Sequence, residues 1–142
     1  MACLEVLKEL QETTLIRERL LNRLRNELSK FVRGSGDEEV VKDLIEDLRF
    51  NRRNYIKLSA EISKKGVLTN ELSNDLSTLI EYNVLIALNN ELELLSRVYK
   101  YVQEGRIKLL MLEDIHSDIE LINDIMYRFS TILPSFKDVH QS

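Results

Sequence analysis

The chain has 142 residues, of which 44% are hydrophobic and 31% are charged, with four glycines, one proline and a formal net charge of −4. This length suits one domain with a core of its own and is too short for two. So few helix-breaking residues favour long helices. An acidic chain is a poor general binder of nucleic acid, because affinity for phosphate comes from accumulated Lys and Arg. The composition therefore predicts an all-α protein in which any contact with nucleic acid is local.

Cysteine content and hydropathy narrow the class further. Cys3 is the single cysteine, so an intramolecular disulfide and a Cys₂His₂ zinc site are both excluded. Charged residues interrupt the N-terminal stretch, unlike a signal peptide, and no apolar run approaches the roughly 20 residues of a membrane span. We therefore expect a soluble cytoplasmic protein without a cofactor or membrane partner, near the nucleoid if archaeal and nuclear if eukaryotic.

The first predicted helix covers residues 2–33, where apolar residues recur three and four positions apart. Thr13 and Thr14 interrupt this stripe, which leaves open a bend or a break into two helices. The run Gly34-Ser35-Gly36 supplies a helix stop and a flexible turn.

The second predicted helix runs from Asp37 to Lys65 and is the most individual stretch of the chain. It opens with acidic residues, which suit the positive end of a helix dipole, and it closes before Gly66. Its middle carries a basic set, which consists of Arg49, Arg52, Arg53 and Lys57.

The third predicted helix begins near Thr69 and ends at Gly105. Asparagines are weak helix formers, and three of them fall in its middle, so we expect a kink or an interruption near residues 82–90. The apolar run at 106–112 fits either a short strand or a buried helical turn.

The fourth predicted helix repeats apolar residues at three and four from Ile115 up to Pro134. Residues 1–133 are therefore predicted to form a single helical domain, and residues 134–142 a C-terminal tail. The architecture we expect is a bundle of four long antiparallel amphipathic helices joined by short turns.

Glu113 and His116 give the one spacing typical of a metal site, with a carboxylate and an imidazole one helical turn apart. A di-iron bundle needs two such pairs and two more glutamates, and the other histidine, His140, falls in the tail. A surface Glu and His are therefore favoured, and no metal is predicted. The acidic residues around them suggest a solvated or partner-facing surface, formed by Asp114, Asp118, Glu120 and Asp124. No nucleophile motif or phosphate-binding Gly-rich loop occurs, so we do not expect an enzyme.

The basic set allows two interpretations. In one, it is a solvated face whose cations pair with Glu46 or Glu61 on the same helix. In the other, it belongs to an interface where guanidinium groups bridge carboxylates and aromatic residues pack beside them. Binding to nucleic-acid phosphate is a third, less favoured use. The candidate interface residues are Arg49, Arg52, Arg53, Tyr55 and Lys57.

Residues 44–60, LIEDLRFNRRNYIKLSA, resemble the signature helix of GINS subunits, and residues 68–71 resemble the Leu-Thr-x-Glu start of that family's next helix. The resemblance covers mainly residues 38–100. It implies a non-catalytic α-domain that packs beside paralogous subunits and links the MCM helicase to a RecJ-like partner in DNA replication. It also implies that the basic set is buried or lies in an interface. Family members usually carry a small β-domain, of which residues 106–112 are the one candidate trace.

Helices of about 30 residues reach about 45 Å, longer than a compact bundle of this size needs, so apolar surface should remain for another chain. We therefore expect a non-catalytic scaffold subunit whose partners are identical or paralogous helical subunits. Two alternatives stay open. One is a small helical nucleic-acid-binding subunit of a ribonucleoprotein similar to CRISPR effector complexes, and the other is a generic helical dimerisation module.

Overall fold

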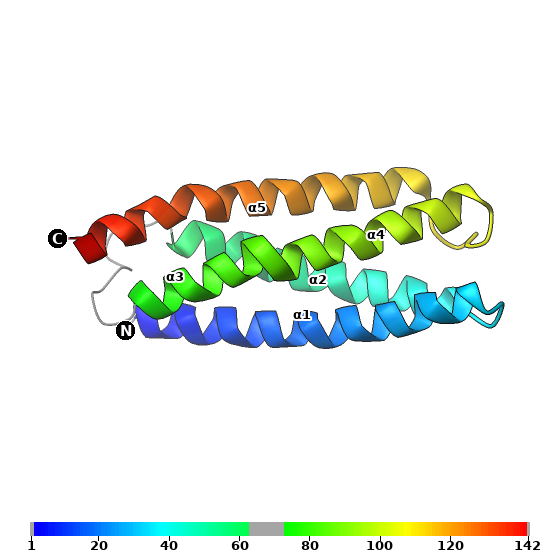
Figure 1. Ribbon diagram of the computed structural model, residues 1–142, viewed down its shortest axis with the longest axis horizontal. Helices are drawn as coiled ribbons and strands as arrows, with labels where there is room; N and C mark the ends of the chain where they lie inside the picture. The colour runs from blue at the N-terminus through cyan, green and yellow to red at the C-terminus, as the bar shows by residue number, and fades with distance from the viewer. Residues whose placement is uncertain (1, 63–72, 142) are drawn as a thin grey trace.

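The computed structural model describes residues 2–62 and 73–141, and these form an all-α bundle without a strand. The helices are α1 (Ala2–Val32), α2 (Glu38–Ile62), α3 (Ser73–Tyr82), α4 (Leu88–Gln103) and α5 (Leu112–Gln141). A π-helical turn, η1 (Asn83–Ala87), joins α3 to α4 so that the three segments form one continuous rod. Four rods therefore lie side by side in the described ranges (Figure 1), and the predicted fold class is confirmed.

The rods are arranged as two antiparallel hairpins, α1 with α2, and the α3–η1–α4 rod with α5. α1 packs against α2 and α4, while α5 packs against α2 and the α3–η1–α4 rod. Within the described ranges the backbones of α1 and α5 do not approach each other closely, nor do those of α2 and α4, so these are the two diagonals of the bundle. Figure 1 shows the two hairpin turns at one end and both chain ends at the other. None of the described helices combines the length and hydrophobicity that crossing a membrane requires.

Both hairpin turns use a glycine with positive φ as the helix stop. Gly34 has φ of 80° and Gly105 has φ of 78°. In each turn the residue after the glycine donates its N–H to a carbonyl five positions earlier, at 2.9 Å from Ser35 to Lys30 and from Arg106 to Tyr101. This geometry satisfies the last carbonyls of the helix and turns the chain back.

The helix interruptions differ in part from those the sequence predicts. α1 passes unbroken through Thr13 and Thr14, which are both buried against the bundle, and the Thr14 hydroxyl donates to the Leu10 carbonyl one turn earlier at 2.7 Å. The predicted interruption near residues 82–90 is confirmed as η1. The helix stop predicted at Pro134 is wrong, since α5 continues to Gln141. Proline removes one backbone donor, but its φ is compatible with a helix.

The strand allowed for residues 106–112 is absent, because residues 104–111 form the loop between α4 and α5. Its apolar residues Ile107 and Leu110 are buried against the bundle end instead of pairing with another strand. The N–H of Lys108 donates to the Glu38 carboxylate, and Arg106 donates to the Phe31 carbonyl. These two hydrogen bonds connect the turn between α4 and α5 to the turn between α1 and α2.

Replacing Gly36 by alanine should destabilise this end of the bundle. A Cβ at Gly36 would overlap the ring of Phe31, which stacks on Tyr101 with centroids 5.8 Å apart. Because Phe31 is buried and cannot move freely, we expect Gly36→Ala to lower the free energy of unfolding by about 1–3 kcal/mol in urea denaturation. Ser35→Ala, at an exposed neighbouring position, is the control and should cost less than about 0.5 kcal/mol. A Gly36→Ala variant as stable as this control would contradict the prediction, because it would show that the Phe31 ring can move aside without cost.

Candidate functional site: a buried arginine–carboxylate network

Charged side chains from all four rods meet inside the bundle. Arg17 of α1, Arg52 of α2 and Glu91 of α4 are at most 1% exposed, and Asp118 of α5 is 5% exposed. Each of them occupies a core-facing position on a helix whose other core positions are mostly apolar. Because a buried charge without a partner is very costly, their mutual contacts decide whether this bundle can close.

The contacts form one chain of ion pairs across the bundle. Glu91 accepts hydrogen bonds from Arg17 Nη1 and, at 3.2 Å, from Arg52 Nε. Arg52 Nη1 in turn donates to Asp118 Oδ1 at 2.6 Å. Arg49 closes the chain at the rim with a two-pronged contact to Asp118, at 3.0 Å from Nε and 2.9 Å from Nη2. The order is therefore Arg17, Glu91, Arg52, Asp118 and Arg49.

Two fully buried cations are thus balanced by two carboxylates. Burial lowers the pKa of Arg17 to about 10 and also lowers the pKa of Arg52, which Asp118 opposes. The hydrogen bond to Asp118 raises the pKa of Arg49. All three guanidinium groups therefore stay charged at neutral pH. Arg17 Nε and Nη2 find no hydrogen-bond partner among the described residues, but its guanidinium lies 4.6 Å from the centre of the Tyr55 ring, a cation–π contact.

A layer of neutral polar groups lies beside the charges. The Tyr55 hydroxyl donates to Asn83 Oδ1 at 2.7 Å and lies 3.1 Å from Thr14 Oγ1. Asn83, the first residue of η1, donates from Nδ2 to Thr14 Oγ1 at 3.0 Å. The π-helical turn therefore begins at the residue that ties α3 to α1 and α2, in keeping with the frequent placement of such turns at special sites. Burial raises the pKa of Tyr55.

The structure divides the predicted interface residues between two sides of α2. Arg52 and Tyr55 are buried in the network, and Arg49 is at its rim. Arg53 and Lys57 are exposed on the outer side. The suggestion that the cations pair with acidic residues of the same helix is wrong for Arg49 and Arg52, since their partners belong to α4 and α5.

Sequence reasoning missed the partners of these arginines. Asp118 was expected on a solvated or partner-facing acidic surface, but it is buried because Arg49 and Arg52 neutralise it. Arg17 and Glu91 were not singled out. A usable indication exists for Arg17, which lies seven residues after Leu10 and seven before Leu24, both fully buried. That spacing puts it in the core-facing row of α1.

The residues considered for a metal site remain at the surface. Glu113 and His116 border a shallow groove with Tyr99, and His116 Nε2 lies 3.4 Å from Glu120 Oε1 on the same helix. His116 is 58% exposed in this pair. No group of three metal-ligating side chains occurs in the part of the chain that the structure describes.

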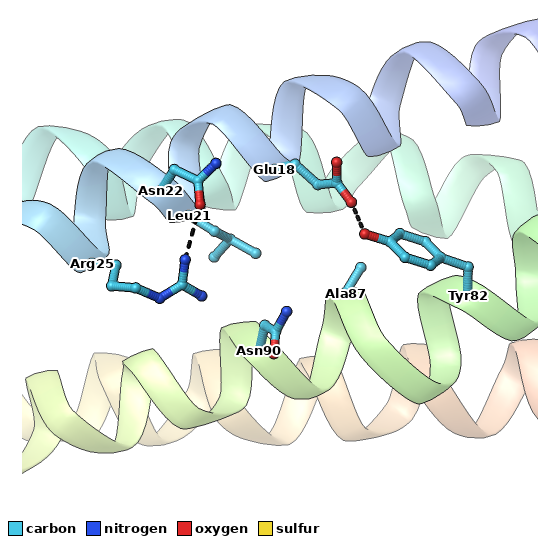
Figure 2. Close-up of a pocket in the computed structure, with 7 residues that line it drawn as sticks. All are labelled: Glu18, Leu21, Asn22, Arg25, Tyr82, Ala87 and Asn90. Carbon is cyan, nitrogen blue, oxygen red and sulfur yellow. Dashed lines mark hydrogen bonds between the residues drawn. The ribbon is translucent and has the colours of Figure 1, made fainter.

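A small pocket lies between α1 and the α3–η1–α4 rod (Figure 2). The Tyr82 hydroxyl donates to the Glu18 carboxylate across it, while Arg25 donates to Asn22 Oδ1 at 2.9 Å on α1. Its volume of about 200 Å³ is below the range of about 300–1,000 Å³ typical of small-molecule sites. The contact between Tyr82 and Glu18 joins the two hairpins.

Removing the central carboxylate should strongly destabilise the bundle. Glu91→Gln keeps the size of the side chain but leaves Arg17 without a counter-charge and weakens the support of Arg52. We expect the free energy of unfolding to fall by about 3–5 kcal/mol, the range for breaking a buried ion pair. Urea denaturation followed by circular dichroism measures this change.

The matched control is Asp124→Asn, which removes the carboxylate of a half-exposed pair with Arg128 on one helix. Surface pairs of this kind contribute less than about 1 kcal/mol. The double variant Arg17→Met with Glu91→Met, which removes opposite charges together, should be less destabilised than Glu91→Met alone. Equal losses for Glu91→Gln and the control would show that the network does not stabilise the fold.

The buried phenol should make stability depend on alkaline pH. Folding favours the neutral form of Tyr55, whose pKa is raised above the ordinary 10.0. The stability that the wild type holds over Tyr55→Phe should therefore be constant below pH 10 and fall as the pH rises beyond it, because the unfolded chain ionises first. Denaturation of both proteins across this range tests the prediction. Tyr127→Phe, at a residue that is 70% exposed, should show no such trend.

Compared with known proteins, the chain matches no family model, no curated protein and no solved structure.

Proposed function

We propose that this chain is a non-catalytic scaffold subunit whose rigid bundle holds its outer helix faces in place for other helical proteins. The observation that carries the proposal is the division of α2. Its inner arginine, Arg52, is buried and forms ion pairs with Glu91 and Asp118, while Phe50 and Arg53 are exposed on the outer side of the same helix.

The burial of the network supports a structural role. Its four central side chains are at most 5% exposed and neutralise one another. A substrate could reach them only if the bundle opened, which would separate the ion pairs. A network of this kind is suited to setting the register of helices, the best-attested use of buried polar groups.

Exposed apolar residues support a partner. A single exposed leucine is ordinary on a protein surface, but some large apolar residues here occur as exposed neighbours. Leu85 and Ile86 of η1 are 68% and 46% exposed, and Leu109 and Met111 of the loop before α5 are 44% and 63% exposed. Phe50 of α2 is 66% exposed.

The nucleic-acid alternative has less support. Arg49 and Arg52 are engaged with carboxylates of the bundle, so two of the four cations in the basic set are unavailable to phosphate. The two outward cations, Arg53 and Lys57, share their side of α2 with acidic residues. Such a mixed surface would repel a phosphate backbone as well as attract it.

The resemblance of residues 44–60 to the GINS signature helix suggests DNA replication as the setting of this scaffold. We propose that the subunit links the replicative MCM helicase to a RecJ-like protein, as that family implies. Arg52 is buried, one of the two states that the resemblance implies for it. Residues 68–71, the second part of the resemblance, lie outside the described residues.

Purification of the tagged chain from its native cell, with quantitative mass spectrometry, tests this function. We expect an MCM helicase and a RecJ-like protein to be enriched over an untagged control. Leu85→Asp with Ile86→Asp, at exposed positions, should reduce the recovery of partners that bind η1 without changing the circular dichroism spectrum. Enrichment of other proteins alone would contradict the replication setting, and enrichment of none would contradict the scaffold role.

A further inference from the structure

The outer side of α2 carries one stripe of exposed residues with Phe50 at its centre. At about 100° per residue, seven residues of α2 lie within two helical turns and about 60° of Phe50, counting Phe50 itself, on the side opposite the core. They are Asp43, Glu46, Asp47, Phe50, Arg53, Asn54 and Lys57, and all are exposed. We call these seven residues the α2 stripe. Glu39 and Glu61, eleven positions away in either direction, continue this side toward the helix ends.

The bundle leaves the α2 stripe unsatisfied. Phe50 is the large apolar residue of the stripe and is 66% exposed. Arg53 and Asp47 make no ion pair with any residue in the described ranges, in contrast to the inner Arg49 and Arg52. The stripe is therefore free to meet another surface.

The charges of the stripe are arranged in opposite order on the two sides of Phe50. The acidic residues precede it and the basic residues follow it. If two α2 helices cross antiparallel at Phe50, a residue a given number of positions after Phe50 lies level with the residue the same number before it in the other copy. Arg53 then lies level with Asp47 and beside Glu46, and Lys57 faces Asp43. Glu61 lies level with Glu39, but these two are eleven positions from the crossing point, where the helices diverge. Asn54 faces Glu46, which can accept a hydrogen bond from the amide.

From this self-complementarity we infer that two copies of the chain pair antiparallel through their α2 stripes, about a two-fold axis at Phe50. The inference rests on the proposed scaffold function and names the partner of this face. A two-fold axis makes each facing pair occur twice, as in other isologous dimers. A parallel pairing would place Arg53 opposite Arg53 and Asp47 opposite Asp47, so the charges select the antiparallel orientation.

The two kinds of contact have different roles in this dimer. The Phe50 rings of the two copies supply the buried centre, since aromatic residues are frequent anchors of interfaces. The exposed charge pairs set orientation more than affinity and are screened by salt. One helix from each copy buries less surface than a standard interface, so we expect a dimer that dissociates on dilution.

Sedimentation velocity of the purified full chain over a range of concentrations tests the inference. We expect a monomer–dimer equilibrium for the wild type that weakens with added salt. Asp47→Arg and Arg53→Asp each place like charges opposite one another twice per dimer, and each should raise the dissociation constant at least tenfold. The double reversal, Asp47→Arg with Arg53→Asp, restores opposite charges between these two positions and should associate more tightly than either single variant, although position 53 also lies beside Glu46.

Two further variants complete the design. Phe50→Glu removes the anchor and should leave a monomer with an unchanged circular dichroism spectrum. Arg23→Asp alters an exposed arginine of α1 outside the stripe and should dimerise like the wild type. The pair Asp47 and Arg53 is the sharper choice for charge reversal, because Lys57 also borders a groove containing Glu9 and Glu12 of α1.

Either of two results would overturn the inference. One is a wild type that stays monomeric at every concentration, and the other is unchanged dimerisation in the single charge-reversal variants. The scaffold proposal is tested separately, by the enrichment of partner proteins from the native cell. A monomer that enriches partners from its native cell contradicts the α2 dimer alone, whereas a charge-dependent dimer that enriches no other protein contradicts the wider scaffold role alone.

Discussion

The bundle depends on the neutralisation of Arg17 and Arg52. A guanidinium group this deeply buried costs several kcal/mol of desolvation unless a carboxylate faces it. The carboxylates come from α4 and α5, and the cations come from α1 and α2, so each hairpin supplies charges of one sign. Neither hairpin can bury its own charges alone. The ion pairs can form only when the two hairpins dock with their charged residues at the same level along the bundle axis. The network therefore favours one register of the two hairpins.

The helices could be predicted from the sequence because apolar residues repeat at helical spacing, whereas the network could not. A charged residue has the same letter whether it is exposed or buried, and Arg17 and Glu91 are 74 residues apart. Arg17 and Asp118 each interrupt a core-facing apolar row, which indicates burial but names no partner. Choosing the partner requires the order in which the four rods surround the core, and helical periodicity in the sequence does not give that order.

Two local features show where short patterns are ambiguous. Asn83 was predicted to weaken the third helix, and it does begin the π-helical turn, but its side chain is also buried between Thr14 and Tyr55. A residue that is a poor helix former can thus be retained for a tertiary hydrogen bond. The apolar run before α5 has no strand beside it within residues 2–62 and 73–141, and Ile107 and Leu110 cover the end of the core as a loop.

The consecutive residues Arg52 and Arg53 have different roles on one helix. Arg52 stabilises the core, and Arg53 is exposed on the outer side. Arg52 is buried by its partners on α4 and α5, which fixes the rotation of α2 about its own axis. Because that rotation is fixed, Arg53 and Phe50 are held on the opposite side, in one line with Asp47. If α2 could rotate about its axis, different residues would face another copy at different times, and no fixed order of charges would be available for pairing. The inner ion pairs therefore give the outer stripe its defined order, and with it the capacity to distinguish an antiparallel partner from a parallel one.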